Sequence, residues 1–181
     1  MTFSLALSLL IACSSGIGAQ ADAFVPLVRS IADRLNTADQ VALSKWDTGQ
    51  LVYDPQREAQ VIANAAAAAS EYGLAAEDAT NIFTDQIEAN KEVQYALLNN
   101  WRRQGSAPAT PRQSLPDVIR PVLDRLQGSI MQSLQDVTVL RRTAGCQILV
   151  AKAVGQFASQ ASLDVLHLAA LDRAVARVCV S

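Results

Sequence analysis

The sequence predicts an all-α protein, a single domain of six helices. Apolar residues recur at helical spacing along most of the chain, and no long stretch alternates apolar and polar residues as a half-buried strand would. Ala, Leu, Gln and Arg, which favour helices, fill the segments between a few Pro and Gly breaks. Of the 181 residues, 50% are hydrophobic, which is enough for one buried core.

The charge balance argues against nucleic acid as a partner. The net charge is -2, and no Lys/Arg run is longer than the pairs Arg102-Arg103 and Arg141-Arg142. Binding to a phosphate backbone requires a basic face, which this sequence lacks. With one His and 3 Cys in the chain, we expect neither a metal site nor a cofactor.

Residues 1–21 are predicted to be a signal peptide. The apolar stretch 5–12 is too short to span a bilayer, and small residues follow it up to the Ala-Gln-Ala of residues 19–21. No Lys or Arg precedes that stretch, which departs from the usual signal-peptide pattern and would fit a misplaced start of the sequence. A buried first helix is the alternative to a signal peptide. Residues 10–13 also resemble a lipoprotein box, so lipid attachment at Cys13 competes with cleavage after Ala21. Both routes predict a periplasmic or secreted protein without a membrane span.

Removal of the signal peptide leaves two cysteines, Cys146 and Cys179. An even number of cysteines in an oxidising compartment predicts a disulfide between them. Two buried thiols are the alternative, which export disfavours. Closing a loop of this size would stabilise the fold by about 3 to 4 kcal/mol in the chain-entropy description.

One linker-like stretch interrupts the mature chain, residues 22–181. Residues 106–116 are rich in Pro, Ser and Ala, unlike the helical segments on either side. They are expected to join a first group of helices in 22–105 to a second group in 117–181. No repeat at a fixed period is visible, which disfavours a solenoid.

Three helices are predicted before the linker, over residues 24–46, 55–73 and 76–101. The Asp-Thr-Gly-Gln stretch at 47–50 ends the first helix. Asp54 suits the N-cap of the second helix, and Pro55 suits its first helical position. The third helix is expected to end before Gly105.

Three more helices are predicted after the linker, over residues 117–137, 140–160 and 162–178. Asp117 is the expected N-cap of the fourth helix, and Pro121 falls in its first turn, where the missing N–H costs least. A disulfide would then tie the fifth helix to the end of the sixth.

Two cations interrupt the apolar face of the first helix. The stripe at positions 27, 31, 34, 38, 41 and 45 reads Leu, Ile, Arg, Ala, Val and Lys. Arg34 and Lys45 therefore point the same way, about 16 Å apart along the helix axis. Taken singly, each is equally well explained as an edge residue whose charged end reaches solvent.

The third helix repeats this anomaly. Its stripe at positions 83, 87, 90, 94, 97 and 101 reads Phe, Ile, Asn, Gln, Leu and Trp. Asn90 and Gln94 need hydrogen-bond partners if they are buried, so they predict a polar pocket inside the bundle. A purely structural hydrogen-bond network is the alternative. Arg57, in the first turn of the second helix, opposes the helix dipole, which indicates a partner anion.

These residues together resemble the all-helical chorismate mutases. The resemblance covers residues 24–101 and rests on Arg34, Lys45, the run Val-Tyr-Asp-Pro-Gln-Arg-Glu at 52–58 and the run Ile-Glu-Ala-Asn-Lys-Glu-Val-Gln at 87–94. The second half is similar to the secreted subtype, in which one chain supplies the whole pocket. That likeness rests on Arg120 and Asp124 after the linker, and on the separation of Cys146 from Cys179.

The resemblance implies an enzyme of aromatic amino acid biosynthesis. Chorismate mutases convert chorismate to prephenate by a Claisen rearrangement, which needs a compact conformer and charge stabilisation but no covalent intermediate. By resemblance, Arg34, Arg57 and Arg120 bind the two substrate carboxylates through bidentate hydrogen bonds.

The resemblance also implies the remaining roles at the site. Lys45 and Gln94 would meet the negative charge that develops on the ether oxygen, and with Arg57 they form the implied catalytic set. Glu58 would accept the ring hydroxyl, with Asp54 beside it. Asn90 would line the ring-carboxylate end, although the family often has a hydroxyl residue there.

Two further questions stay open at this point. A non-catalytic exported helical bundle, such as an inhibitor or a small-anion-binding module, would explain the export and the fold equally well. A homodimer is common in the subtype, but a pocket built from one chain creates no catalytic need for it.

His167 is expected to pack at a surface edge, since the reaction requires no proton shuttle.

Overall fold

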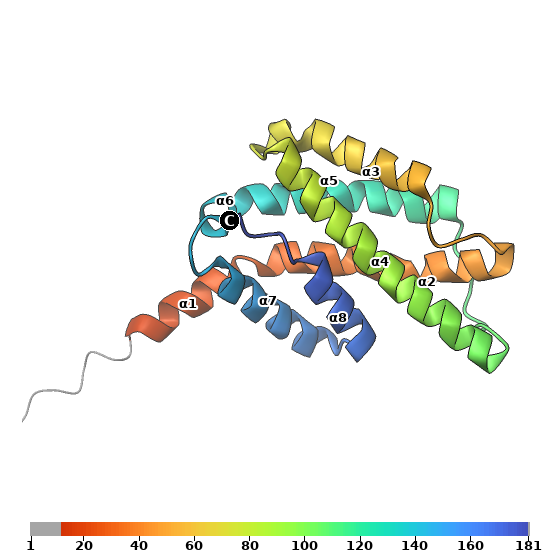
Figure 1. The fold of residues 1–181 in the computed structure, drawn as a ribbon. Helices are drawn as coiled ribbons and strands as arrows, with labels where there is room; N and C mark the ends of the chain where they lie inside the picture. The colour runs from red at the N-terminus through yellow and green to blue at the C-terminus, as the bar shows by residue number, and fades with distance from the viewer. Residues whose placement is uncertain (1–11, 181) are drawn as a thin grey trace, which may run out of the picture.

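The computed structural model describes residues 12–180, and every regular element in that range is helical (Figure 1). The all-α prediction is therefore confirmed. Four helices carry the architecture: α2 (Val25–Thr48), α3 (Pro55–Ala68), α4 (Ala76–Gln104) and α5 (Arg120–Asp136). α4 packs against both α2 and α3, and α5 packs against α2, so that the four enclose a shared interior.

Shorter elements complete the fold: α1 (Ala12–Asp22), a 3₁₀ turn (Ala69–Tyr72), a π-helical turn (Leu115–Ile119), α6 (Thr138–Arg141), α7 (Cys146–Ala161) and α8 (Val165–Ala174). α7 packs on α2 and α1, while α8 contacts both α2 and α4. The end of the chain returns to the side of α6 (Figure 1), where Val180 N donates to Arg141 O at 2.9 Å.

The predicted signal peptide falls largely on residues whose structure is not described, since 1–11 lie outside the described range. From residue 12 the segment is helical in α1, and Ala21 is buried against the core. Cleavage after Ala21 and lipid attachment at Cys13 stay predictions. Within residues 12–180, no helix combines the length and the apolar character that crossing a membrane requires.

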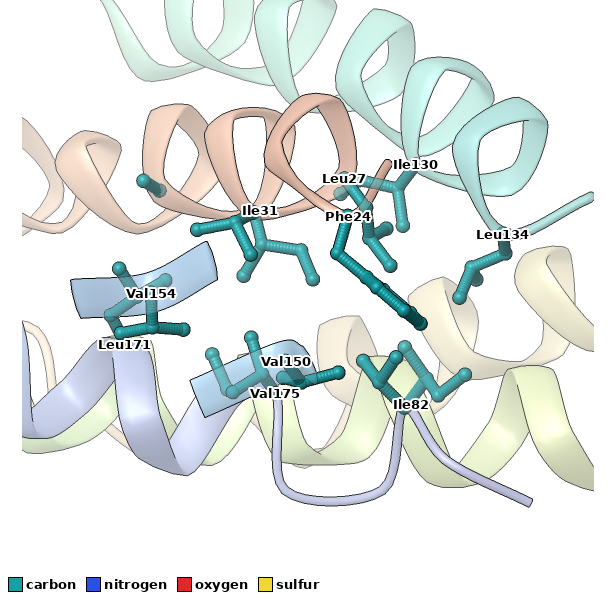
Figure 2. Close-up of a cluster of buried hydrophobic side chains, with 14 of the residues drawn as sticks. Phe24, Leu27, Ile31, Ile82, Ile130, Leu134, Val150, Val154, Leu171 and Val175 are labelled. Atoms are coloured by element: carbon teal, nitrogen blue, oxygen red, sulfur yellow. The ribbon is translucent and has the colours of Figure 1, made fainter. Parts of the chain in front are cut away.

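The main core lies where α2, α4, α5, α7 and α8 meet (Figure 2). Phe24, just before α2, is fully buried and points into this cluster, beside Ile82 of α4 and Leu134 of α5. Leu171 of α8 belongs to the same cluster. Burying each such side chain contributes roughly 1.5 to 3 kcal/mol, so this core fixes how the helices cross.

The three helices before the linker begin close to where the sequence predicts, and the first and third also end there. The second, predicted over 55–73, is α-helical only to Ala68 and continues as the 3₁₀ turn. α2 ends at Gly49, which has a φ of 69° that favours glycine. Asp54 is the N-cap of α3, where its carboxylate accepts from Arg57 N at 3.1 Å, and Pro55 is the first helical residue. α4 runs on to Gln104 and ends at Gly105.

The predicted cap of the fourth helix was wrong. Ser114, not Asp117, is the N-cap: its Oγ accepts from Asp117 N at 3.2 Å and donates to Asp117 Oδ2 at 2.6 Å. Helical backbone therefore starts at Leu115, two residues before the predicted start, in the π-helical turn that leads directly into α5. Pro116 falls in that first turn, where a missing N–H leaves no bond unmade.

The predicted helix over 140–160 is divided. α6 ends at Arg141, and α7 begins only at Cys146, after an irregular turn. Arg141 is 2% exposed, and its Nε donates to Val178 O at 2.6 Å. The break therefore lies directly after a buried guanidinium that binds the C-terminal segment.

The predicted sixth helix, over 162–178, is shorter at both ends. Ser162 is the left-handed C-cap of α7, with a φ of 51°. α8 starts after Asp164, whose carboxylate accepts from His167 N at 3.0 Å, and it ends at Ala174. The residues that follow form the irregular tail that Arg141 binds.

A disulfide joins Cys146 to Cys179, as predicted, with a Cα–Cα distance of 5.9 Å. It ties the first residue of α7 to the tail after α8, closing a loop with a sequence separation of 33. The disulfide and the Arg141 contact therefore hold the same C-terminal segment at two points.

The linker is irregular up to Ser114, after which the π-helical turn begins, and it is bound along α2. Arg112 Nε lies 2.8 Å from Asp47 Oδ2, and Gln40 bonds the backbone on both sides of Arg112. Its amide donates to Pro111 O at 3.3 Å and its carbonyl accepts from Gln113 N at 3.0 Å. Bound in this way, the linker places the start of α5 next to the group formed by α2, α3 and α4.

Candidate active site

α2 directs Arg34 and Lys45 into the interior of the bundle. Arg34 is 6% exposed, and its guanidinium lies 5.8 Å from the centroid of the Phe83 ring. Its Nε is buried without a hydrogen-bond partner among the described residues. Lys45 is half-buried and donates from Nζ to Val52 O at 2.6 Å. The edge-residue explanation therefore fails for Arg34, and the loop after α2 anchors Lys45.

The first turn of α3 contributes Asp54, Arg57 and Glu58. The cap is reciprocal, because Asp54 accepts from Arg57 N while Asp54 N donates to Glu58 Oε1 at 3.2 Å. The Arg57 guanidinium lies 3.8 Å from Asp124 Oδ1 of α5. That contact is long and Asp124 is 72% exposed, so it holds Arg57 only weakly.

α4 contributes Asn90 and Gln94, one turn apart on the same face. Gln94 Nε2 donates to Asn90 Oδ1 at 2.7 Å, so the two carboxamides satisfy each other in part. Gln94 is 4% exposed, and its Oε1 is buried without a partner in the described chain. Buried polar atoms are usually paired, so this face of Gln94 has hydrogen-bonding capacity that the fold itself does not use.

Arg120 reaches the site from the other half of the chain, at the first residue of α5. It is exposed, unlike Arg34, and lies at the rim of the same cavity. Its position follows from the linker, which is bound to α2 up to Gln113 and leads into the π-helical turn.

A single cavity with a volume of ≈ 150 Å³ brings the predicted residues together. All eight line it: Arg34, Lys45, Asp54, Arg57, Glu58, Asn90, Gln94 and Arg120. Apolar walls come from both halves of the chain, among them Val41, Ile87, Ile119 and Leu123. Basic side chains outnumber the carboxylates in this lining, so the cavity suits a small anion.

Burial disfavours the charged forms of the two α2 cations, Arg34 and Lys45, and neighbouring carboxylates offset this only in part. It lowers the pKa of Arg34 to about 10, and the neighbouring Arg57 charge acts in the same direction. It also lowers the pKa of Lys45 from the ordinary lysine value, against the opposing effect of Asp54 and Glu58. An anion in the cavity would favour the charged form of both side chains and so act against the effect of burial.

The sequence prediction missed three polar residues in the lining: Thr37, Gln50 and Lys91. Thr37 lies one turn after Arg34 and donates from Oγ1 to Arg34 O at 2.8 Å. Lys91 lies four residues after Ile87 and three before Gln94, a spacing that places all three on one helix face. That spacing is the signal that could have identified Lys91.

The arrangement agrees with the comparisons to known proteins. Residues 26–95 match the family described as chorismate mutase type II. A crystal structure of chorismate mutase from Burkholderia phymatum is 81% identical in sequence, with a TM-score of 0.89, covering 91% of this chain and 100% of that one. The chain therefore belongs to the type II chorismate mutase family.

More distant relatives extend the comparison over the whole chain. The secreted chorismate mutase of Mycolicibacterium smegmatis is 28% identical over 180 residues, which is 95% of this chain and 98% of that protein. The secreted chorismate mutase of Mycobacterium tuberculosis is 28% identical, covering 84% of this chain and 76% of that protein. A crystal structure of chorismate mutase from Burkholderia thailandensis is 32% identical, with a TM-score of 0.83, covering 87% and 99%.

Proposed function

We propose that this chain is an exported chorismate mutase, which converts chorismate to prephenate by a Claisen rearrangement. The observation that supports this most is the cavity, which is lined by cations of α2, α3 and α5 together with the carboxamides of α4. The substrate carries two carboxylates, and its rearrangement needs positioning and electrostatic stabilisation but no nucleophile or general base.

The three arginines are assigned to substrate binding. Arg34 is the deepest of them and has a buried Nε–H without a partner in the described chain, so it suits the more enclosed carboxylate. Arg57 and Arg120 stand nearer the rim and suit the other end. Guanidinium groups bind carboxylates in a bidentate manner, which would hold the enolpyruvyl arm folded over the ring.

Lys45 and Gln94 are assigned to the transition state. Negative charge grows on the ether oxygen as its C–O bond breaks, so donors fixed there stabilise the transition state more than the substrate. The Lys45 ammonium has N–H groups beyond the one that Val52 accepts. The Gln94 amide likewise has a second N–H besides the one donated to Asn90.

The two acidic residues of the cavity and the carboxamide of Asn90 are assigned to the part of the site that binds the substrate ring. Glu58 is the proposed acceptor of the ring hydroxyl, and Asp54 supports it through the reciprocal cap. Asn90 contributes indirectly, because its carbonyl oxygen orients the Gln94 amide. This is a different role from a direct contact with the ring carboxylate.

Export is part of the proposal. It rests on the signal-peptide pattern of residues 1–21 and on the two relatives named as secreted. The mature domain would be residues 22–181, in the periplasm or outside the cell. Lipid attachment at Cys13 is the competing outcome, and the mass of the mature N-terminus distinguishes the two. A homodimer would be compatible with activity but not required for it.

The decisive experiment mixes the purified exported protein with chorismate and follows the loss of the diene absorbance. We expect an acceleration that scales with protein concentration and is lost in a Lys45→Met variant. Binding of chorismate without acceleration would reject the enzyme and leave a non-catalytic anion-binding bundle as the better description.

A further inference from the structure

Lys91 is a basic residue of the cavity lining whose contacts differ from those of the other cations. Its Nζ lies 3.0 Å from Glu58 Oε2 and 2.8 Å from Glu88 Oε1. It also lies 5.3 Å from the centroid of the Tyr53 ring. The Lys91 side chain is 13% exposed and that of Glu58 is 18% exposed, so the pair between these two residues is made largely out of water.

The Lys91 ammonium is already paired within the protein, with two carboxylates. Its Nζ is paired with two carboxylates and lies beside an aromatic ring. Burial lowers its pKa, but the hydrogen bonds that it donates to both carboxylates outweigh burial and raise the pKa. Arg34, in contrast, has a buried Nε without a partner among the described residues. A substrate carboxylate would therefore compete poorly for Lys91 and well for Arg34.

Glu58 is the residue on which Lys91 acts. Asp54 N holds Glu58 Oε1 at 3.2 Å, while Lys91 holds Oε2 at 3.0 Å. The first contact is local to the start of α3, and the second crosses to α4. Each carboxylate oxygen can accept a second hydrogen bond, so Glu58 keeps acceptor capacity toward the cavity that it lines.

We propose that Lys91 is a positioning residue: its cross-helix ion pair fixes the Glu58 carboxylate in the orientation that accepts the substrate hydroxyl. The proposal rests on the function proposed above. A glutamate side chain loses considerable rotamer freedom when it is ordered, and the ion pair completes that ordering before the substrate binds. Lys91 thus contributes to catalysis without touching the substrate.

The test is a double-mutant cycle on kcat and KM for chorismate, with Lys91→Met and Glu58→Gln made singly and together. A misplaced contact group typically costs about 10- to 100-fold in rate, and we expect a loss of that order in kcat/KM for K91M. In the E58Q background, K91M should change kcat/KM less than about twofold, because the residue it positions is already altered. Lys91→Arg should restore most of the activity.

Two matched controls separate positioning from structure. Glu88→Gln removes the other carboxylate partner of Lys91 but leaves the Glu58 pair, and Glu88 does not line the cavity, so activity should stay within about twofold. Lys152→Met removes an exposed lysine of α7 and should have no effect. If K91M does not fold, Lys91→Gln takes its place in the cycle.

The outcomes are distinct. An inactive wild-type protein would refute the proposed function itself, before the variants are compared. An active wild type with an equally active K91M, or with the same loss in both backgrounds, would overturn the positioning role. Loss in the wild-type background alone, with recovery in K91R, would establish it.

Discussion

Lys45 Nζ and Val52 O lie 2.6 Å apart, so the loop that follows α2 fixes the ammonium of a helix residue. Val52 is itself buried, at 6% exposure, against Trp101 and Leu98 of α4. The acceptor is therefore held by a small apolar cluster. Lys45 does not depend on a bound ligand for its position, which is what a preorganised cation requires.

Replacing Lys45 with Met should nearly abolish turnover while the fold is kept. Removal of one fixed transition-state donor typically lowers the rate by about 10²- to 10³-fold, and loss of the charge adds to that. Losing the bond to Val52 should cost only about 1 kcal/mol of the free energy of unfolding. Steady-state kinetics and thermal unfolding measure the two effects. A Lys45→Met enzyme with nearly wild-type kcat would contradict the assignment.

Activity should stay level from mildly acid to mildly alkaline pH, because the Gln94 amide donates at any pH. At higher pH it should fall as Lys45 is deprotonated, and this fall comes earlier than for an ordinary lysine because burial lowers the Lys45 pKa. Gln94→Glu should instead be active only at acid pH, since a carboxylate must be protonated to donate. The kcat/KM profiles of both proteins test this, and a steep loss just above neutrality in the wild type would be evidence against it.

Arg120 should affect substrate binding more than stability. The side chain is exposed at the rim, so Arg120→Met should leave the unfolding temperature nearly unchanged. Loss of a bidentate carboxylate contact should raise KM by about tenfold or more. Arg125→Met is the matched control, because Arg125 is also exposed on α5 but does not line the cavity. Equal KM values for the two variants would remove Arg120 from the site.

His167 should give the fold a pH dependence unconnected with catalysis. Nε2 lies 3.2 Å from Asp39 Oδ1 of α2, and Nδ1 lies 2.8 Å from Asp164 Oδ2. The hydrogen bond to Asp39, followed by that to Asp164, raises the pKa of His167 from 6.5 to about 9, although burial opposes this. The stabilisation is therefore complete below about pH 6.5 and is lost as the pH rises through about 9.

Urea unfolding of His167→Gln at two pH values tests that dependence. Both carboxylates are well exposed, so the loss at pH 6 should be only about 1 to 2 kcal/mol. The difference from wild type should nearly vanish at about pH 10. Chorismate turnover should be unaffected at pH 6, since His167 does not line the cavity. A stability loss that is the same at both pH values would show that packing, not charge, is responsible.

The sequence predicted the helices before the linker well because their signals are local. Gly49, Asp54 with Pro55, and Gly105 act through their own backbone, and each ends or begins a helix where expected. The break between α6 and α7 is different. It lies beside a buried Arg141 that donates to Val178 O, and no pattern near Arg141 identifies a partner so distant in the sequence.

The residues of the site also differ in whether a local sequence signal or a contact between distant segments places them. Arg34 with Lys45, and Asn90 with Gln94, were predictable because each pair lies on one stripe of one helix. The ion pair between Lys91 and Glu58 joins two helices, and only the crossing of α3 and α4 brings it about. The same is true of Arg120, whose place in the cavity depends on how Gln40 and Asp47 bind the linker.

The bound linker has a consequence for how the protein behaves on dilution. α5 and the group of α2, α3 and α4 belong to one polypeptide. The effective concentration of Arg120 at the cavity therefore does not depend on the amount of protein present. A pocket shared between two separate chains would fall apart as they dissociate. Turnover per molecule should therefore be constant down to nanomolar protein.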